Sequence, residues 1–213
     1  METPFTIEQF FEVFENYNTS VFPAQFIFIG LGILGIMLIH TRTNYSNHFI
    51  TGFLGFLWLW IGIVYHFGFF TLINKAAYGF GILFVLQGLF FVREMFRNRL
   101  EFSFQRNTRG ILGYFFIFFG LVIYPVTGYL FGATFITTIS LGLPCPTTIL
   151  TFGFFLLTNS KFRRYLLIIP TIWAIIGIFA AVNFGVYQDF FMIIAAIVAN
   201  LILLKRQKTL AVA

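Results

Sequence analysis

The side chains best suited to chemistry are one histidine and one cysteine, each inside or next to an apolar stretch. His66 shares a predicted helical face with Gly52, Gly55 and Gly62. Glycines let a second helix approach closely, so we expect His66 to point into a helical bundle. Two interpretations stay open. His66 is either a neutral imidazole hydrogen-bonded in the core, or a metal ligand, proton relay or substrate contact.

Cys145 lies between two prolines in the segment Leu143-Pro144-Cys145-Pro146-Thr147-Thr148. Pro146 suits the first position of a helix and Cys145 its cap. A helix from Cys145 to Asn159 rises about 21 Å, whereas the hydrocarbon layer is about 30 Å thick. Its N-terminus should therefore lie below the membrane surface, where free N–H groups bind anions and activate thiols. A structural turn with an inert thiol is the alternative.

Further polar candidates lie on the same predicted side. Asp189 opens the last apolar stretch and fits either a helix-capping group or a ligand. The predicted substrate-binding set is His66, Cys145, Tyr65, Tyr124, Thr147, Gln188, Asp189 and Glu12. No catalytic residue is assigned, and His66 and Cys145 are the candidates for a metal.

The composition determines which elements must position these residues. The chain has 213 residues, of which 59% are hydrophobic and 9% charged, and its mean hydropathy is +0.92. Soluble globular domains have about 25% charged residues. These values exclude a soluble, a disordered and a disulfide-rich chain, and predict an all-α polytopic membrane bundle.

Seven apolar stretches are predicted to cross the membrane as one domain over residues 21–204. They cover residues 21–39, 49–72, 76–92, 110–131, 145–158, 165–182 and 187–204, the fifth being short. The preceding segment 133–142 is rich in threonine and predicts a re-entrant or half-helical stretch. A basic tail follows at residues 205–213.

Residues 1–20 form a separate outer segment. Thr6 and Gln9 fit a capping box. Apolar residues then recur at helical spacing, with acids on the opposite face: Ile7, Phe10, Phe11 and Phe14 against Glu8, Glu12 and Glu15. Helices that lie on membranes usually have a basic polar face. We therefore expect this one over the mouth of the bundle, its acids either solvated or attracting cations at a rim.

The basic residues predict the orientation. Of the 13, only Lys75 lies outside the odd-numbered connections and the tail, which hold Arg42, Arg93, Arg97, Arg99, Arg106, Arg109, Lys161, Arg163, Arg164, Lys205, Arg206 and Lys208. Because basic loops stay cytoplasmic, the N-terminus is predicted outside and the C-terminus inside. The net charge of +6 then reflects this bias and contact with anionic lipid, not nucleic-acid binding.

Cofactor motifs are missing from the sequence. We find no phosphate-binding loop, dinucleotide fingerprint or paired-cysteine metal motif, no lysine deep in a span for retinal, and no second deep histidine for a haem. The cofactor, if there is one, is unknown at this stage.

Several segments carry a resemblance: Pro4–Phe10, Tyr17-Asn18, Pro23–Gln25, Trp58–His66 and Gly142–Thr148. Together they resemble a family of uncharacterised bacterial multi-pass membrane proteins, which implies a bacterial cytoplasmic (inner) membrane. The topology also resembles the small seven-helix sugar transporters, which are built as three helices, a linker helix and three helices.

Three functions remain open. The first is a small channel, permease or transporter with an outward-facing solute or ion site near His66 and Cys145. The second is a membrane-embedded enzyme or metal/thiol redox protein that uses the same two residues. The third is a non-catalytic assembly factor or accessory subunit. The predicted partners are the lipid bilayer and a small solute or ion, and an oligomer is allowed.

Overall fold

A computed structural model describes residues 5–97, 100–158 and 162–212, and this part of the chain is helical apart from its connections and two isolated β-bridges. Glu2, Pro4, Arg99 and Lys161 lie outside the described residues. The elements in chain order are α1 (Ile7–Val21), α2 (Ala24–Thr41), α3 (Ser46–Trp60), η1 (Ile61–Phe67), η2 (Phe70–Leu72), α4 (Ala77–Arg97), α5 (Thr108–Phe118), η3 (Phe119–Ile123), α6 (Tyr124–Leu130), α7 (Pro144–Leu156), α8 (Tyr165–Phe184), η4 (Tyr187–Asp189) and α9 (Phe190–Val212).

Six helical stretches in the described ranges are long and apolar enough to cross a membrane, where the sequence predicted seven. They are Ala24–Thr41, Ser46–Leu72, Ala77–Arg97, Thr108–Leu130, Tyr165–Phe184 and Tyr187–Lys205. The predicted fifth span corresponds to α7, which has 13 residues. At 1.5 Å per residue α7 rises about 20 Å, too little for about 30 Å of hydrocarbon.

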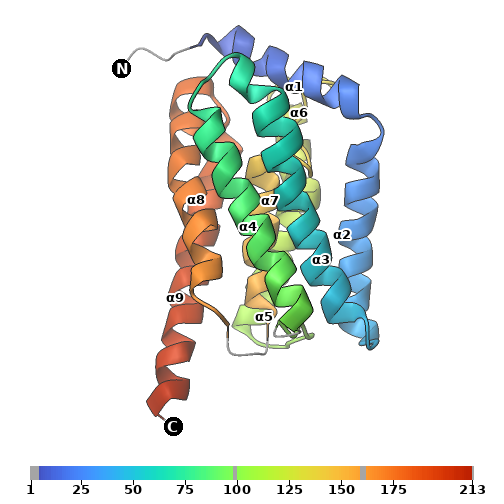
Figure 1. The fold of residues 1–213 in the computed structure, drawn as a ribbon, viewed down its shortest axis with the longest axis vertical. Helices are drawn as coiled ribbons and strands as arrows, with labels where there is room; N and C mark the ends of the chain where they lie inside the picture. The colour runs from blue at the N-terminus through green and yellow to red at the C-terminus, as the bar shows by residue number, and fades with distance from the viewer. Residues whose placement is uncertain (1–4, 98–99, 159–161, 213) are drawn as a thin grey trace.

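The short helix α7 lies in the middle of the bundle (Figure 1) and packs against α3, α5, α8 and α9. Each of its residues except Cys145 is buried. A helix enclosed by protein on all sides does not have to match the thickness of the bilayer. This enclosure explains how a helix of only 13 residues can follow a non-helical segment here.

Helix α1 crosses one end of the bundle (Figure 1). Its predicted capping box is present, since Gln9 N donates to Thr6 Oγ1 at 3.3 Å and Thr6 N donates to Gln9 Oε1 at 2.9 Å. Phe10 and Phe14 are buried against the bundle, and the glutamates are exposed. The amphipathic pattern therefore places α1 over the bundle with its acidic face outward.

The segment 131–143 is irregular, where the sequence predicted a re-entrant or half-helical stretch over 133–142. Side chains of α1 bond the carbonyls that a helix would have bonded internally. Asn18 Nδ2 donates to Ile136 O at 2.7 Å and to Thr138 O at 2.9 Å, and the Tyr17 hydroxyl donates to Gly142 O at 2.8 Å. Burial raises the pKa of Tyr17, which keeps its hydroxyl protonated as a donor.

Two helix pairs, α3 with α4 and α5 with α7, pack through matching glycines. A Cβ on Gly62 would lie 2.9 Å from Gly81 O, and one on Gly120 would lie 2.7 Å from Pro146 O. Two turns further along α4, a Cβ on Gly88 would lie 2.9 Å from Leu59 N. Two turns further along α7, a Cβ on Gly153 would lie 2.8 Å from Ile117 N. Only glycine allows backbones to approach this closely.

The matching packing reflects a repeat between two segments of the sequence. Gly52–Val64 reads GFLGFLWLWIGIV and Gly110–Val122 reads GILGYFFIFFGLV, with glycine, leucine and valine at the same places. In this register the π-helical turns η1 and η3 begin at equivalent positions, Ile61 and Phe119. Both helices run toward the α1 end, so the two pairs form a parallel repeat (Figure 1).

The glycine packing gives a test of stability. We expect Gly88→Ala and Gly153→Ala each to lower the free energy of unfolding by about 1–3 kcal/mol, because the added methyl group overlaps the neighbouring helix. Thermal unfolding in detergent, followed by tryptophan fluorescence, measures this. Gly79→Ala in the same helix as Gly88 is the control, since a Cβ there meets nothing within 4 Å. Equal stability of Gly153→Ala and Gly79→Ala contradicts the proposed packing.

Candidate functional site

A cavity of about 320 Å³ lies at the α1 end of the bundle. Phe5, Phe10 and Phe14 line it from the N-terminal segment. The remaining lining is mostly apolar and aromatic and comes from the bundle: Tyr65, Phe70, Asn74, Ala76, Phe80, Ile139, Pro144, Cys145, Trp173, Ile176, Gly177, Phe179, Ala180, Phe184, Val186 and Asp189. Its size is within the range of small-molecule sites.

The polar part of this cavity is centred on Asp189. The Tyr124 hydroxyl donates a hydrogen bond to Asp189 Oδ1, and Cys145 Sγ donates to Asp189 Oδ2 at 3.5 Å. Asp189 is 1% exposed, and no lysine, arginine or histidine of the described chain pairs with it. A buried carboxylate without a cation is costly, so this arrangement is suited to a positively charged ligand or to a proton.

Asp189 was expected to be either a helix-capping group or a ligand, and its carboxylate accepts hydrogen bonds from Tyr124 and Cys145. Asp189 is the last residue of η4 and immediately precedes α9. The left-handed Gly185 ends α8 and turns the chain, after which Asp189 N donates to Val186 O at 2.9 Å. This tight turn aims the carboxylate at Tyr124 and Cys145.

We call α3 with η1 and α4 the first repeat unit, and α5 with η3 and α7 the second. In each unit, a π-helical turn carries or precedes residues of the site. The turn η1 carries Tyr65 and His66, and η3 immediately precedes Tyr124. Such turns insert one residue into an α-helix and occur frequently at functional sites. In the register of the repeat, His66 corresponds to Tyr124, so the two units contribute different polar groups from equivalent places.

His66 is fully buried, which confirms that it points into the bundle. Neither ring nitrogen has a hydrogen-bond partner, so the predicted core hydrogen bond is missing. Aromatic rings surround the imidazole at centroid distances of 4.8–6.0 Å, namely Tyr65, Phe70, Phe80, Phe84 and Trp173. His66 therefore supports the aromatic wall of the cavity and makes no bond to the Cys145 thiol.

The structure gathers part of the predicted set. Tyr65, Cys145 and Asp189 line one cavity, with Tyr124 bonded to Asp189 and His66 stacked edge-on against Tyr65.

The other predicted residues lie elsewhere. Glu12 is exposed on the far face of α1. Gln188 lies against Gly128 of α6, and Thr147 Oγ1 accepts a long bond of 3.4 Å from Gly142 N. Gln188 therefore points to another side of η4 than Asp189, and Thr147 to another side of α7 than Cys145.

Two buried polar residues of α4 lie outside the predicted site set, because that set was placed at the α1 end of the bundle. Gln87 Nε2 donates to Leu166 O at 3.2 Å, and the Tyr165 hydroxyl donates to Glu94 Oε1. Gln87 Oε1 and Glu94 Oε2 have no partner. The signal was readable, since Phe80, Phe84, Gln87, Phe91 and Glu94 recur at helical spacing on one face.

An aromatic layer separates the cavity from Gln87 and Glu94. Trp58 stacks on Phe84 with centroids 4.5 Å apart, and Phe84 meets Trp173 edge-on at 4.9 Å. Trp58 Nε1 donates to Thr151 Oγ1 at 3.0 Å, which fixes the indole against α7. In this conformation the cavity is closed toward the opposite end of the bundle.

The His, Cys, Asp and Glu side chains near the cavity do not support a metal centre. No group of three or more His, Cys, Asp or Glu side chains within the described ranges could hold a metal ion. The chemistry available at the cavity is thus binding through one carboxylate, hydroxyl and thiol groups, and aromatic faces.

The roof of the cavity can be tested through the single cysteine. We expect Cys145 to react slowly with N-ethylmaleimide in detergent, because α1 covers it. Phe10 stacks on Phe184 with centroids 4.5 Å apart, so Phe10→Ala should loosen α1 and speed labelling at least about tenfold. Ile7→Ala, on an exposed position of α1, is the matched control and should leave the rate unchanged. Equal rates in all three proteins contradict a roof formed by α1.

Comparison with known proteins gives a family and no function. A search of curated proteins and of solved structures finds no match to the chain. The model of the family of unknown function DUF6064 matches residues 7–213, and the chain therefore belongs to that family.

Proposed function

We propose that the protein is a small membrane transporter that binds an apolar organic cation in the cavity beneath α1. The observation that carries this proposal is the buried carboxylate of Asp189, which has hydrogen bonds from Tyr124 and Cys145 but no cationic partner in the described chain. A ligand with a charged amine supplies the missing charge, and its apolar body fills the remaining volume.

The aromatic lining favours the same ligand class. The faces of Phe, Tyr and Trp rings carry negative electrostatic potential and attract cations. Rings of Phe10, Tyr65, Phe70 and Trp173 all border the cavity that Asp189 enters. A neutral apolar ligand would leave the carboxylate unpaired, and an anion would be repelled by it.

The repeat of the α3/α4 and α5/α7 pairs supports transport rather than simple binding. Parallel repeats are common in transporters, whose halves move relative to each other around a central site. Here each repeat unit delivers one wall of the cavity, and the aromatic layer of Trp58, Phe84 and Trp173 closes it on one side. Beyond that layer, Gln87 and Glu94 lie on the same face of α4, toward the opposite end.

For the arrangement in the membrane, we place α1 outside and the C-terminus inside a bacterial cytoplasmic membrane. The basic residues that end α2 and α4 and precede α5 and α8 support this, because all lie at the end away from α1. In this arrangement the irregular segment 131–143 and α7 together return the chain across the bundle, enclosed by the other helices.

The geometry favours transport over enzymatic or redox chemistry. A cysteine nucleophile needs an adjacent base, usually histidine. Cys145 instead contacts a carboxylate, and His66 makes no bond to it. The accessory-subunit hypothesis rests on the exposed acidic face of α1 and is distinguished by experiment.

Uptake into proteoliposomes tests the proposal with benzyltrimethylammonium as the probe. We expect saturable uptake, reduced about tenfold or more in Asp189→Asn because the ion pair is lost. Glu12→Gln removes an exposed carboxylate from α1 and should have no effect. Neopentylbenzene, the uncharged analogue of the same shape, should not compete.

The outcomes separate the hypotheses. Binding of benzyltrimethylammonium without uptake indicates a receptor or accessory protein. Equal uptake in wild type and Asp189→Asn, or equal competition by the uncharged analogue, overturns the assigned site.

A further inference from the structure

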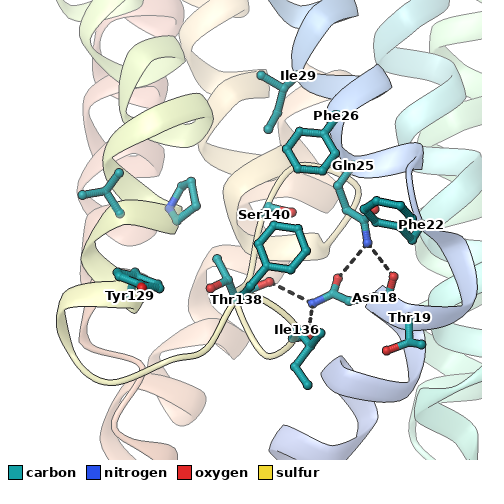
Figure 2. A pocket seen from close by; sticks show the side chains of 13 residues that line it. Asn18, Thr19, Phe22, Gln25, Phe26, Ile29, Tyr129, Ile136, Thr138 and Ser140 are labelled. Atoms are coloured by element: carbon teal, nitrogen blue, oxygen red, sulfur yellow. Dashed lines mark hydrogen bonds between the residues drawn. The ribbon is translucent and has the colours of Figure 1, made fainter.

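A second hollow, which we call the α2–α6 groove, lies at the α1 end but on the outer wall of the bundle. Its volume is about 450 Å³. Figure 2 shows Phe22, Phe26 and Ile29 on one side and Tyr129 on the other. The complete lining is Asn18, Thr19, Phe22, Gln25, Phe26, Ile29, Pro125, Val126, Tyr129, Phe135, Ile136, Thr138 and Ser140. None of these residues borders the cavity beneath α1.

The walls of the groove are open to the surrounding bilayer. Phe26 is 53% exposed, Val126 50% and Tyr129 63%, although all three are large. They belong to α2 and α6, which lie in stretches long and apolar enough to cross a membrane. A groove between two such helices, with apolar exposed rims, is accessible to the acyl chains of lipids.

One end of the groove is polar, and its side-chain amide donors are already used. Gln25 Nε2 donates to Asn18 O at 2.9 Å and to Asn18 Oδ1 at 3.3 Å (Figure 2). The Asn18 amide nitrogen is used by Ile136 O and Thr138 O. Gln25 Oε1 is left buried without a partner. Gln25 Oε1 is thus the acceptor here that lacks a hydrogen bond, and the side chains that cover it must move aside for a ligand to reach it.

The electrostatics of this end favour a positive charge. Helix α1 ends at Val21, beside the groove, and has no basic residue in its last turn. The partial negative charge of its C-terminus therefore has no cation beside it, although Gln25 Nε2 bonds one of its last carbonyls, Asn18 O. Glu15 precedes Thr19 by one helical turn on the exposed side of α1, and no lysine or arginine lines the groove.

We propose that the α2–α6 groove binds a phospholipid of the adjacent leaflet that carries a primary ammonium head group. The acyl chain lies along Phe26, Ile29 and Val126, and the ammonium donates to Gln25 Oε1 next to the C-terminus of α1. This site does not depend on the transport function proposed above, because it shares no lining residue with that cavity.

Photocrosslinking in lipid nanodiscs tests the proposal. Full-length protein is reconstituted with phosphatidylethanolamine or phosphatidylcholine probes that carry the same diazirine-labelled acyl chain, and labelled peptides are mapped by mass spectrometry. We expect the ethanolamine probe to label the first turns of α2 and of α6 about three- to tenfold more than the choline probe, whose quaternary ammonium cannot donate.

Three variants sharpen the test. Ile29→Trp fills the groove and should remove the labelling there, whereas Ile175→Trp, on an exposed position of α8, should not. Glu15→Gln changes an exposed side chain and should reduce the preference for ethanolamine without reducing choline labelling. Equal labelling by the two probes, or full labelling of Ile29→Trp when the protein is folded, overturns the proposal.

Discussion

The hydroxyl group of Tyr17 joins three parts of the chain that are far apart in sequence. It accepts a hydrogen bond from Trp60 Nε1 at 2.8 Å and donates one to Gly142 O at 2.8 Å. Since the first bond reaches the last turn of α3 and the second reaches the residues just before α7, α1 is held against both. The roof of the cavity, the irregular segment and the start of α7 all depend on this one side chain.

The same interaction explains how irregular backbone is tolerated here. Carbonyl groups left unbonded in an apolar layer cost several kcal/mol each. Tyr17 and Asn18 satisfy those of Ile136, Thr138 and Gly142. The amphipathic helix α1 is therefore a structural part of the bundle, and its polar residues on the buried face matter more for the fold than its exposed glutamates.

The sequence predicted the features that follow from local pattern. The capping box of Thr6 and Gln9, the inward direction of His66 and the shortness of the fifth apolar stretch were all readable from spacing and composition. The residues that meet at the cavity were only partly readable. Asp189 bonds Tyr124 across more than sixty residues of sequence, and no local pattern encodes that contact. Gln188, its neighbour, was grouped with it by position and turns away toward α6.

The π-helical turns carry a consequence for the history of the chain. An additional residue in a helix shifts everything after it, so two independent insertions would rarely fall at the same place. Ile61 and Phe119 begin these turns at equivalent positions of the two glycine-packed pairs. If the pairs arose by duplication of one ancestral hairpin, the inserted residue predates that event. His66 and Tyr124 differ at equivalent places, as do Phe80 and Cys145, so under such a duplication the backbone deformation is older than these four side chains.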